Sequence, residues 1–173
     1  MNFKLVAFLL FCLLNSCSNN KDSKKSILLI SGKVISIIDG DTYDILIEGN
    51  QTIRVRMEGI DAPEKGMPFS KVSKEYLGSL CFGQKIRFEK SKDDSNGRAI
   101  GFSYLSDGRE LSHEMLRAGM AWHFKRYNSD KDLAELELQA KGSKLGLWAD
   151  ENPLPPWELR KMHRKSKQRK KLI

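Results

Sequence analysis

Three short segments of alternating apolar and polar residues, separated by two tight turns, constrain the fold of this chain more than any other feature. The segments span residues 32–38, 42–48 and 51–58, and the turns between them are an Asp-Gly pair at 39–40 and a Gly-Asn pair at 49–50. Such alternation is typical of strands with one buried face, and Asp-Gly is a strong signal for a tight turn. The pattern predicts a three-stranded antiparallel meander.

Further along the chain the pattern adds two strands and three helices. Residues 85–89 and 98–105 have strand character, whereas 68–80, 111–118 and 130–145 have helical spacing of apolar residues. We expect Ser112 to cap the second helix, Glu137 and Lys141 to pair on the outside of the third, and Pro153, Pro155 and Pro156 to end regular structure. The count predicts an α+β fold, a five-stranded OB-fold Greek-key barrel with about three flanking helices, an architecture that often binds oligonucleotides.

The N-terminal residues predict a leader rather than part of the fold. Lys4 precedes an apolar run over 5–14 that is too short to span a bilayer comfortably and is typical of a secretory signal. Residues 14–17 (Leu-Asn-Ser-Cys) resemble the bacterial lipobox, in which the cysteine, here Cys17, is lipidated; simple cleavage nearby is the alternative. We therefore expect an exported protein, lipid-anchored in a bacterial cell-envelope membrane or otherwise secreted.

The predicted domain boundaries follow from these patterns. Residues 1–17 form the signal peptide, 18–30 a polar tether, 31–150 the folded domain, and 151–173 a Pro-containing linker with a basic tail. The formal net charge of +8 is concentrated in that tail, because residues 157–173 hold eight Lys or Arg against one acid, Glu158. The tail is interpreted as a disordered polyelectrolyte that contacts nucleic acid or anionic lipid, or that is merely solvated.

Cysteine and histidine usage excludes two kinds of site. Outside the leader Cys81 stands alone, so no intramolecular disulfide is available, and its apolar neighbours indicate a small buried hydrophobic residue. The three histidines, His113, His123 and His163, have no paired spacing. The chain therefore lacks the ligand pattern that zinc requires.

Strongly polar residues fall at the turns and strand ends of the predicted meander. Asp39, Asp41, Arg56, Asp61 and Glu64 are placed where a meander brings strand ends together. Any one of them alone is compatible with an ordinary turn or a solvated strand. Carboxylates and an arginine that meet at one end of a small sheet indicate a site for a hard cation and a phosphate.

Each group in this set has a chemical role in such a site. Asp41 and Asp61, with the carbonyl of Ala62, offer the oxygen ligands that calcium prefers. Glu64 follows a proline that stiffens its loop, and a glutamate beside a metal-bound phosphate can orient or deprotonate water. Guanidinium groups, from Arg56 and from Arg98 after the turn at 93–97, would stabilise charge on the phosphate.

Four separated segments resemble the staphylococcal nuclease (thermonuclease) family in order and spacing. They are residues 39–42 (Asp-Gly-Asp-Thr), Arg56, residues 60–64 (Ile-Asp-Ala-Pro-Glu) and residues 94–98 (Asp-Ser-Asn-Gly-Arg), within a match over about 31–150. The resemblance implies an OB-fold nuclease that uses Ca²⁺ to hydrolyse DNA and RNA, preferably single-stranded, leaving 3′-phosphates. It also implies a monomer without an obligate protein partner.

The same resemblance assigns residue roles. It implies that Asp41, Asp61 and the Ala62 carbonyl hold the metal and that Glu64 is the general base or water-positioning group. It further implies that Arg56 and Arg98 bind the scissile phosphate.

The chain departs from the family pattern in its substrate contacts. Ser95 and Asn96 stand where the family's well-known member has lysine and tyrosine, and Lys125 stands where it has a tyrosine, although Tyr127 matches a later one. We expect Tyr127 and Lys125 to contribute stacking and charge to substrate binding. Trp122 is interpreted as core packing.

Two other functions compete with the nuclease hypothesis. One is a non-catalytic nucleic-acid-binding OB-fold lipoprotein, which predicts the loss of at least one catalytic group. The other is a lipid-anchored adhesion or interaction protein that acts through its basic tail. All five groups of the nuclease hypothesis are retained, namely Asp41, Arg56, Asp61, Glu64 and Arg98.

Overall fold

The structure is a computed structural model that describes residues 28–170. The predicted signal peptide, the lipidation of Cys17 and most of the predicted tether lie outside these residues. Within the described range no helix combines the length and the apolar character needed to cross a membrane.

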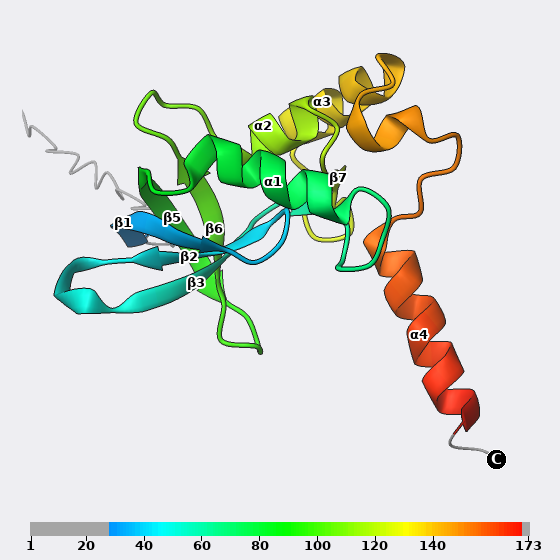
Figure 1. The fold of residues 1–173 in the computed structure, drawn as a ribbon, viewed down its shortest axis with the longest axis horizontal. Coiled ribbons are helices and arrows are strands. Elements are labelled where there is room, and N and C mark those ends of the chain that lie inside the picture. The colour runs from blue at the N-terminus through cyan, green and yellow to red at the C-terminus, as the bar shows by residue number, and fades with distance from the viewer. Residues whose placement is uncertain (1–27, 171–173) are drawn as a thin grey trace, which may run out of the picture.

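Five strands close into a barrel, in the order β1–β2–β3–β6–β5, and β5 pairs back onto β1 (Figure 1). They are β1 (Leu28–Ile37), β2 (Thr42–Leu46), β3 (Thr52–Met57), β5 (Lys85–Asp93) and β6 (Ala99–Tyr104). Neighbouring strands are antiparallel, except that β3 and β6 run parallel. The predicted meander and the predicted α+β, OB-type barrel are confirmed.

The barrel begins earlier than the sequence suggested. Leu28 already pairs with Lys90 of β5, so residues 28–30 of the expected tether belong to β1. A second sheet of two short strands, β4 (Ile60–Asp61) and β7 (Trp122–His123), lies outside the barrel. Strand β4 follows β3 after a turn at Gly59, whose φ of 80° is readily adopted by glycine. This short sheet ties the segment after β3 to the segment before α3.

Three helices occupy the predicted ranges: α1 (Ser70–Cys81), α2 (Leu111–Arg117) and α3 (Lys131–Gly142). Two short 3₁₀ turns complete this part of the chain, η1 (Glu48–Asn50) and η2 (Gly146–Ala149). The cap of α2 differs from the expectation, because the Glu110 carboxylate accepts from the backbone N–H groups of Ser112 and His113. The Ser112 hydroxyl instead donates to the carbonyl of Glu58 at 3.0 Å.

One hydrophobic core fills the barrel and continues beneath the helices. Tyr43 and Phe88 from the strands pack in one cluster with Leu77 of α1 and Leu116 of α2, and all four side chains are fully buried. Cys81 belongs to this core, as predicted, and burial raises the pKa of its thiol to about 12. The thiol is therefore protonated at neutral pH and packs as an apolar side chain.

A fourth helix replaces the disorder that was expected for the tail. Helix α4 (Pro156–Lys170) begins at a proline that was expected to end regular structure. Proline suits the first turn of a helix because the N–H that it lacks has no partner there. The residues that follow are mostly Lys, Arg, Gln, Leu and Met, which favour helices. In Figure 1, α4 extends away from the barrel and from the other three helices.

Candidate active site

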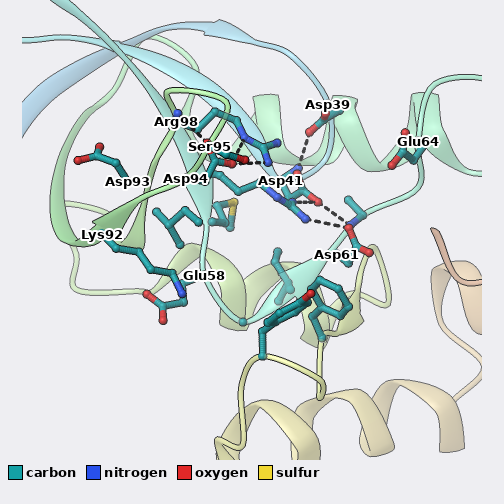
Figure 2. A pocket seen from close by; sticks show the side chains of 18 of the residues that line it. Asp39, Asp41, Glu58, Asp61, Glu64, Lys92, Asp93, Asp94, Ser95 and Arg98 are labelled. Atoms are coloured by element: carbon teal, nitrogen blue, oxygen red, sulfur yellow. Dashed lines mark hydrogen bonds and ion pairs between the residues drawn. The ribbon is translucent and has the colours of Figure 1, made fainter. Parts of the chain in front are cut away.

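A cavity of about 690 Å³ opens at one end of the barrel and collects the polar residues singled out by the sequence. Six segments supply its walls: the β1–β2 turn, β3 with the turn that follows it, β4 with the loop that follows it, the β5–β6 hairpin, the segment after β7, and the first turns of α4. The residues at its centre are Asp39, Asp41, Arg56, Asp61, Glu64, Arg98 and Arg160. Figure 2 shows Asp39, Asp41 and Asp61 gathered on one side of the cavity, with Glu64 beyond Asp61.

The turn that carries Asp39 and Asp41 is held by close packing at Gly40. A Cβ at position 40 would lie 1.9 Å from Ser73 Oγ of α1 and 2.8 Å from Ala62 Cβ. The Ser73 hydroxyl is itself fixed, because it donates to the Met120 carbonyl at 2.8 Å. The absence of a side chain at Gly40 therefore lets the turn press against α1 and places both aspartates at the cavity.

Gly40→Ala should consequently lower the free energy of unfolding by about 1–3 kcal/mol, as is usual when extra atoms enter a packed site. Urea unfolding measures this, and Gly142→Ala is the matched control, because a Cβ at Gly142 meets nothing within 4 Å. Equal stability of the two variants would contradict the packing argument.

Arg56 joins the two aspartates that sequence analysis assigned to a metal. Its Nη2 lies 2.8 Å from Asp61 Oδ1, and its Nη1 forms an ion pair with Asp41 Oδ2. Both carboxylates are buried, with exposed fractions of 4% for Asp41 and 1% for Asp61. Burial lowers the pKa of Arg56, although the charge of Asp61 opposes this shift. One guanidinium thus spans the two carboxylates, which places them side by side.

The backbone of Ala62 completes this contact on the other side of Asp41. Its N–H donates to Asp41 Oδ2 at 2.6 Å, and Ala62 itself is buried at the cavity wall. Asp41 Oδ1 accepts from the hydroxyl of Thr42 at 2.9 Å. Asp39 lies in the same wall, and burial raises the pKa of its carboxyl. The three aspartates form a compact, partly desolvated acidic group.

Arg98 is oriented by a residue that the sequence analysis did not single out. Asp94 Oδ2 accepts from Arg98 Nε at 2.8 Å and lies 2.6 Å from its Nη2. Asp94 Oδ1 accepts from the backbone N–H groups of Asn96 and Arg98, at 2.8 and 3.0 Å. Although desolvation opposes it, these contacts lower the pKa of Asp94 to about 2. The signal was present in the Asp-Ser-Asn-Gly turn, since aspartate commonly bonds to the backbone two residues ahead.

Arg160 of α4 also lies at the site, and no sequence pattern predicts it. Its Nη2 lies 2.5 Å from Asp61 Oδ2, and its Nη1 lies 2.5 Å from Glu64 Oε1. It is separated from these partners by more than ninety residues and belongs to a run of similar basic residues. Nothing local distinguishes Arg160 from its neighbours. The contact follows from the docking of α4.

That docking depends on aromatic contacts at the start of α4. The Trp157 ring stacks on Phe124 with ring centroids 5.4 Å apart and an angle of 8° between the planes. The edge of Trp157 also meets Trp122, with centroids 6.5 Å apart. Phe124 itself lines the cavity. One helical turn after Trp157, the chain brings Arg160 to the acidic group.

Of the two residues predicted to contact substrate, Tyr127 lines the cavity and Lys125 does not. Tyr127 lines the cavity, is 66% exposed and meets the Phe124 ring edge to face at 4.8 Å. Lys125 does not line the cavity, because its ammonium is held at 2.7 Å by Glu137. Trp122 is buried, as expected from its interpretation as a core residue.

The position of Glu137 differs from the prediction that it lies on the outside of α3. It pairs with Lys141 at 3.0 Å as predicted, but it is buried rather than on the outside of α3. Its carboxylate also accepts from the backbone N–H of His123 at 3.1 Å. Although burial acts to raise the pKa of Glu137, the contacts with Lys125, Lys141 and His123 hold it below its usual value. Glu137 thus anchors α3 to the β7 segment.

Between residues 28 and 170 the structure contains no cluster of three or more Asp, Glu, His or Cys side chains arranged to hold a metal ion. The carboxylates at the cavity pair with guanidinium groups instead of facing one another. Arg56 pairs with Asp41 and Asp61, and Arg160 pairs with Asp61 and Glu64. The donors themselves are carboxylate oxygens, the type that hard cations prefer. The acidic group is already balanced by positive charge from the chain itself.

The fold and the site define a class: a small OB-type barrel with flanking helices, whose cavity at one end combines carboxylates with arginines. Residues 54–150 match the family described as "Staphylococcal nuclease homologue". The chain belongs to this family.

Curated relatives extend the match over most of the chain. An Escherichia coli O157:H7 protein named "Uncharacterized endonuclease" is 38% identical over 136 residues, covering 79% of this chain and 87% of the relative. A Haemophilus influenzae protein of the same name is 33% identical over 156 residues, covering 90% and 83%. A Shigella flexneri "Micrococcal nuclease" is 36% identical over 140 residues, covering 75% and 80%.

Proposed function

We propose that this protein is a calcium-dependent nuclease that hydrolyses phosphodiester bonds of DNA and RNA. The observation that carries the proposal is the convergence of Asp41, Arg56, Asp61, Glu64 and Arg98 on one cavity, from elements far apart in the sequence. Family membership and relatives named as nucleases support the same conclusion.

The oxygen donors at the cavity are of the type that binds a hard divalent cation. Asp41 and Asp61 would hold it, since both carboxylates are buried and are bridged by a single guanidinium. Burial also raises the pKa of neighbouring Asp39, although the charge of Arg56 opposes this shift. When bound, Ca²⁺ would polarise the phosphoryl group and help to neutralise its charge.

The arginines provide directed donors for the phosphate. The carboxylate of Asp94 pairs with Nε and Nη2 of Arg98, so Nη1 is the nitrogen that can donate to a phosphate oxygen. Arg56 is buried beneath the same cavity and adds a second positive charge. Fixed donors aimed at developing charge stabilise a pentacoordinate phosphorus more than the ground state.

Glu64 is the group suited to water. It lies at the cavity mouth with 44% of its side chain exposed, and its carboxylate contacts Arg160. In the proposed reaction Glu64 orients a water and accepts its proton, and the water oxygen bonds to phosphorus. The bond from phosphorus to the 5′-oxygen breaks, and the departing 5′-oxygen takes a proton from solvent. The products carry a 3′-phosphate and a 5′-hydroxyl. Arg160 must release Glu64 for this to occur.

Incubation of the full chain with a 5′-labelled single-stranded DNA, with calcium or with chelator, tests the proposal. We expect cleavage with calcium, none with chelator, and fragments whose masses show 3′-phosphates. Cleavage that persists in chelator would contradict calcium dependence. Binding without cleavage under both conditions would instead favour the non-catalytic binding barrel.

A further inference from the structure

Most of the excess positive charge of the protein lies on a surface that the proposed chemistry does not use. After Arg160, helix α4 continues with Lys161, Arg164, Lys165, Lys167 and Arg169, and every residue from 161 to 169 is exposed. We call residues 161–169 the basic arm. It extends about 14 Å at the rise of an α-helix. Because residues 157–173 carry eight basic residues against one acid, the rest of the chain is nearly neutral.

The basic arm starts at the cavity and is held there. Trp157 stacks on Phe124, a residue of the cavity wall, and Arg160 reaches the acidic group from the next turn of α4. In Figure 1 the remainder of α4 projects away from the body of the protein. A polymer that leaves the cavity on this side therefore meets a row of positive charges with no intervening element.

An exposed aromatic ring lies at the junction between the cavity and the arm. Tyr127 lines the cavity, is 66% exposed and contacts Phe124, the ring on which Trp157 stacks. Exposed aromatic rings combined with basic grooves are the common means of binding single strands, because bases stack on the ring while phosphates meet Lys and Arg. The surface thus offers both kinds of contact in sequence.

The arm does not have the pattern of a membrane-binding helix. Such helices bury a continuous face of Trp, Phe or Leu in the lipid boundary. Between residues 161 and 169 the only large apolar residue is Met162, and the other residues not basic at neutral pH are His163, Ser166 and Gln168. A helix that is polar on all sides can bind a flexible polyanion but has no face to insert.

We propose that the basic arm is a binding surface for the sugar-phosphate backbone of a single-stranded polynucleotide outside the cleavage site, with Arg160 and Tyr127 joining it to the cavity. The inference rests on the proposed nuclease function for its substrate class. It adds that affinity depends on strand length, because only strands that extend beyond the cavity reach the arm.

The test compares the full-length protein with a variant in which Arg164, Lys165, Lys167 and Arg169 are all replaced by Gln. Glutamine favours helix about as well as Lys and Arg, and these side chains are exposed, so α4 should persist. Binding of a fluorescent 20-nucleotide single strand is measured by anisotropy in chelator, at several salt concentrations. We expect affinity to fall roughly tenfold or more at low salt, and the slope of log affinity against log salt to shrink by about 2 to 3.

A matched variant removes the same charge elsewhere. Lys71, Lys74, Lys85 and Lys131 are also exposed and lie on α1, β5 and α3, and none of them lines the cavity. Their replacement by Gln should leave most of the affinity and of the salt slope intact. If both variants lose affinity equally, net charge explains the effect and the arm has no special role, which would overturn the proposal.

Two further measurements separate the alternatives. Cleavage of the 20-nucleotide strand should slow in the arm variant, while cleavage of a trinucleotide should not change. Vesicles of anionic lipid should bind both variants alike; a loss confined to vesicles, with strand binding intact, would overturn the proposal in favour of a membrane surface. Because strand binding is measured in chelator, failure of the nuclease assay alone leaves this test able to decide.

Discussion

Replacement of Glu64 by Gln is expected to lower kcat on single-stranded DNA by about 10²–10⁴-fold, the usual contribution of a general base. Glutamine keeps the shape of the side chain but can no longer accept the proton of the attacking water. The residue is partly exposed, at 44% of its side chain, and lies outside the core. The loss should therefore appear in the rate and not in the folded state, as measured by single-turnover cleavage and by urea unfolding.

Glu75 offers a matched control for this substitution. It is an exposed glutamate on α1 that pairs with Lys71 at 3.7 Å, away from the cavity. Glu75→Gln removes the same charge and should leave kcat within about twofold, since exposed ion pairs contribute little. A Glu64→Gln variant that cleaves as fast as Glu75→Gln would remove Glu64 from the proposed mechanism.

Local patterns were sufficient to predict the barrel. The alternation over the first three strands and the turns between them indicate which residues face inward. They do not predict the irregularity between Val34 and Ser36, where the register of β1 against β2 shifts. Tyr43, Ile45 and Val55 are fully buried on the inward face, and the aspartates fall at the turn the pattern indicated. Fold and central site residues therefore came from short-range information together with spacing that resembles a known family.

The contacts that escaped prediction arise from tertiary packing. Arg160 reaches Asp61 only because Trp157 docks on Phe124, and no local pattern in a basic run identifies that arginine. Lys125 was expected at the substrate, but a buried carboxylate holds its ammonium instead. Charge and sequence spacing alone do not predict which carboxylate a long, flexible Lys or Arg side chain will pair with.

Both ends of the folded domain extend beyond the predicted boundaries, again because of tertiary contacts. Residues 28–30 belong to β1 and not to a polar tether: they are Leu, Leu and Ile, and they pair with β5. The tail was interpreted as disordered because of its charge, whereas its residues individually favour helix and its first turn is anchored by an aromatic stack. The composition of a segment indicates how much apolar surface it can bury. It does not reveal that one docked side chain, here Trp157, anchors the first turn of a helix.

Replacement of Arg56 by Met should lower the free energy of unfolding by about 3–5 kcal/mol, the range typical of breaking a buried ion pair by removal of one partner. Methionine fills much of the volume but leaves the buried carboxylates of Asp41 and Asp61 without the guanidinium between them. Arg54→Met is the internal control. Arg54 lies on the same strand and pairs with Asp44 at 2.8 Å, but its side chain is 51% exposed against 12% for Arg56.

The control should lose no more than about 1 kcal/mol, because water screens an exposed pair. A second comparison separates the effect of an unpaired buried charge from that of lost packing. Asp41→Asn added to Arg56→Met should restore part of the stability, because among residues 28–170 Arg56 is the only guanidinium that pairs with Asp41, whereas Asp61 also pairs with Arg160. Both comparisons are read from urea midpoints and slopes at neutral pH in chelator. If Arg54→Met and Arg56→Met proved equally costly, or if Asp41→Asn deepened the loss, the ion pairs at the cavity would not be what holds the acidic group together.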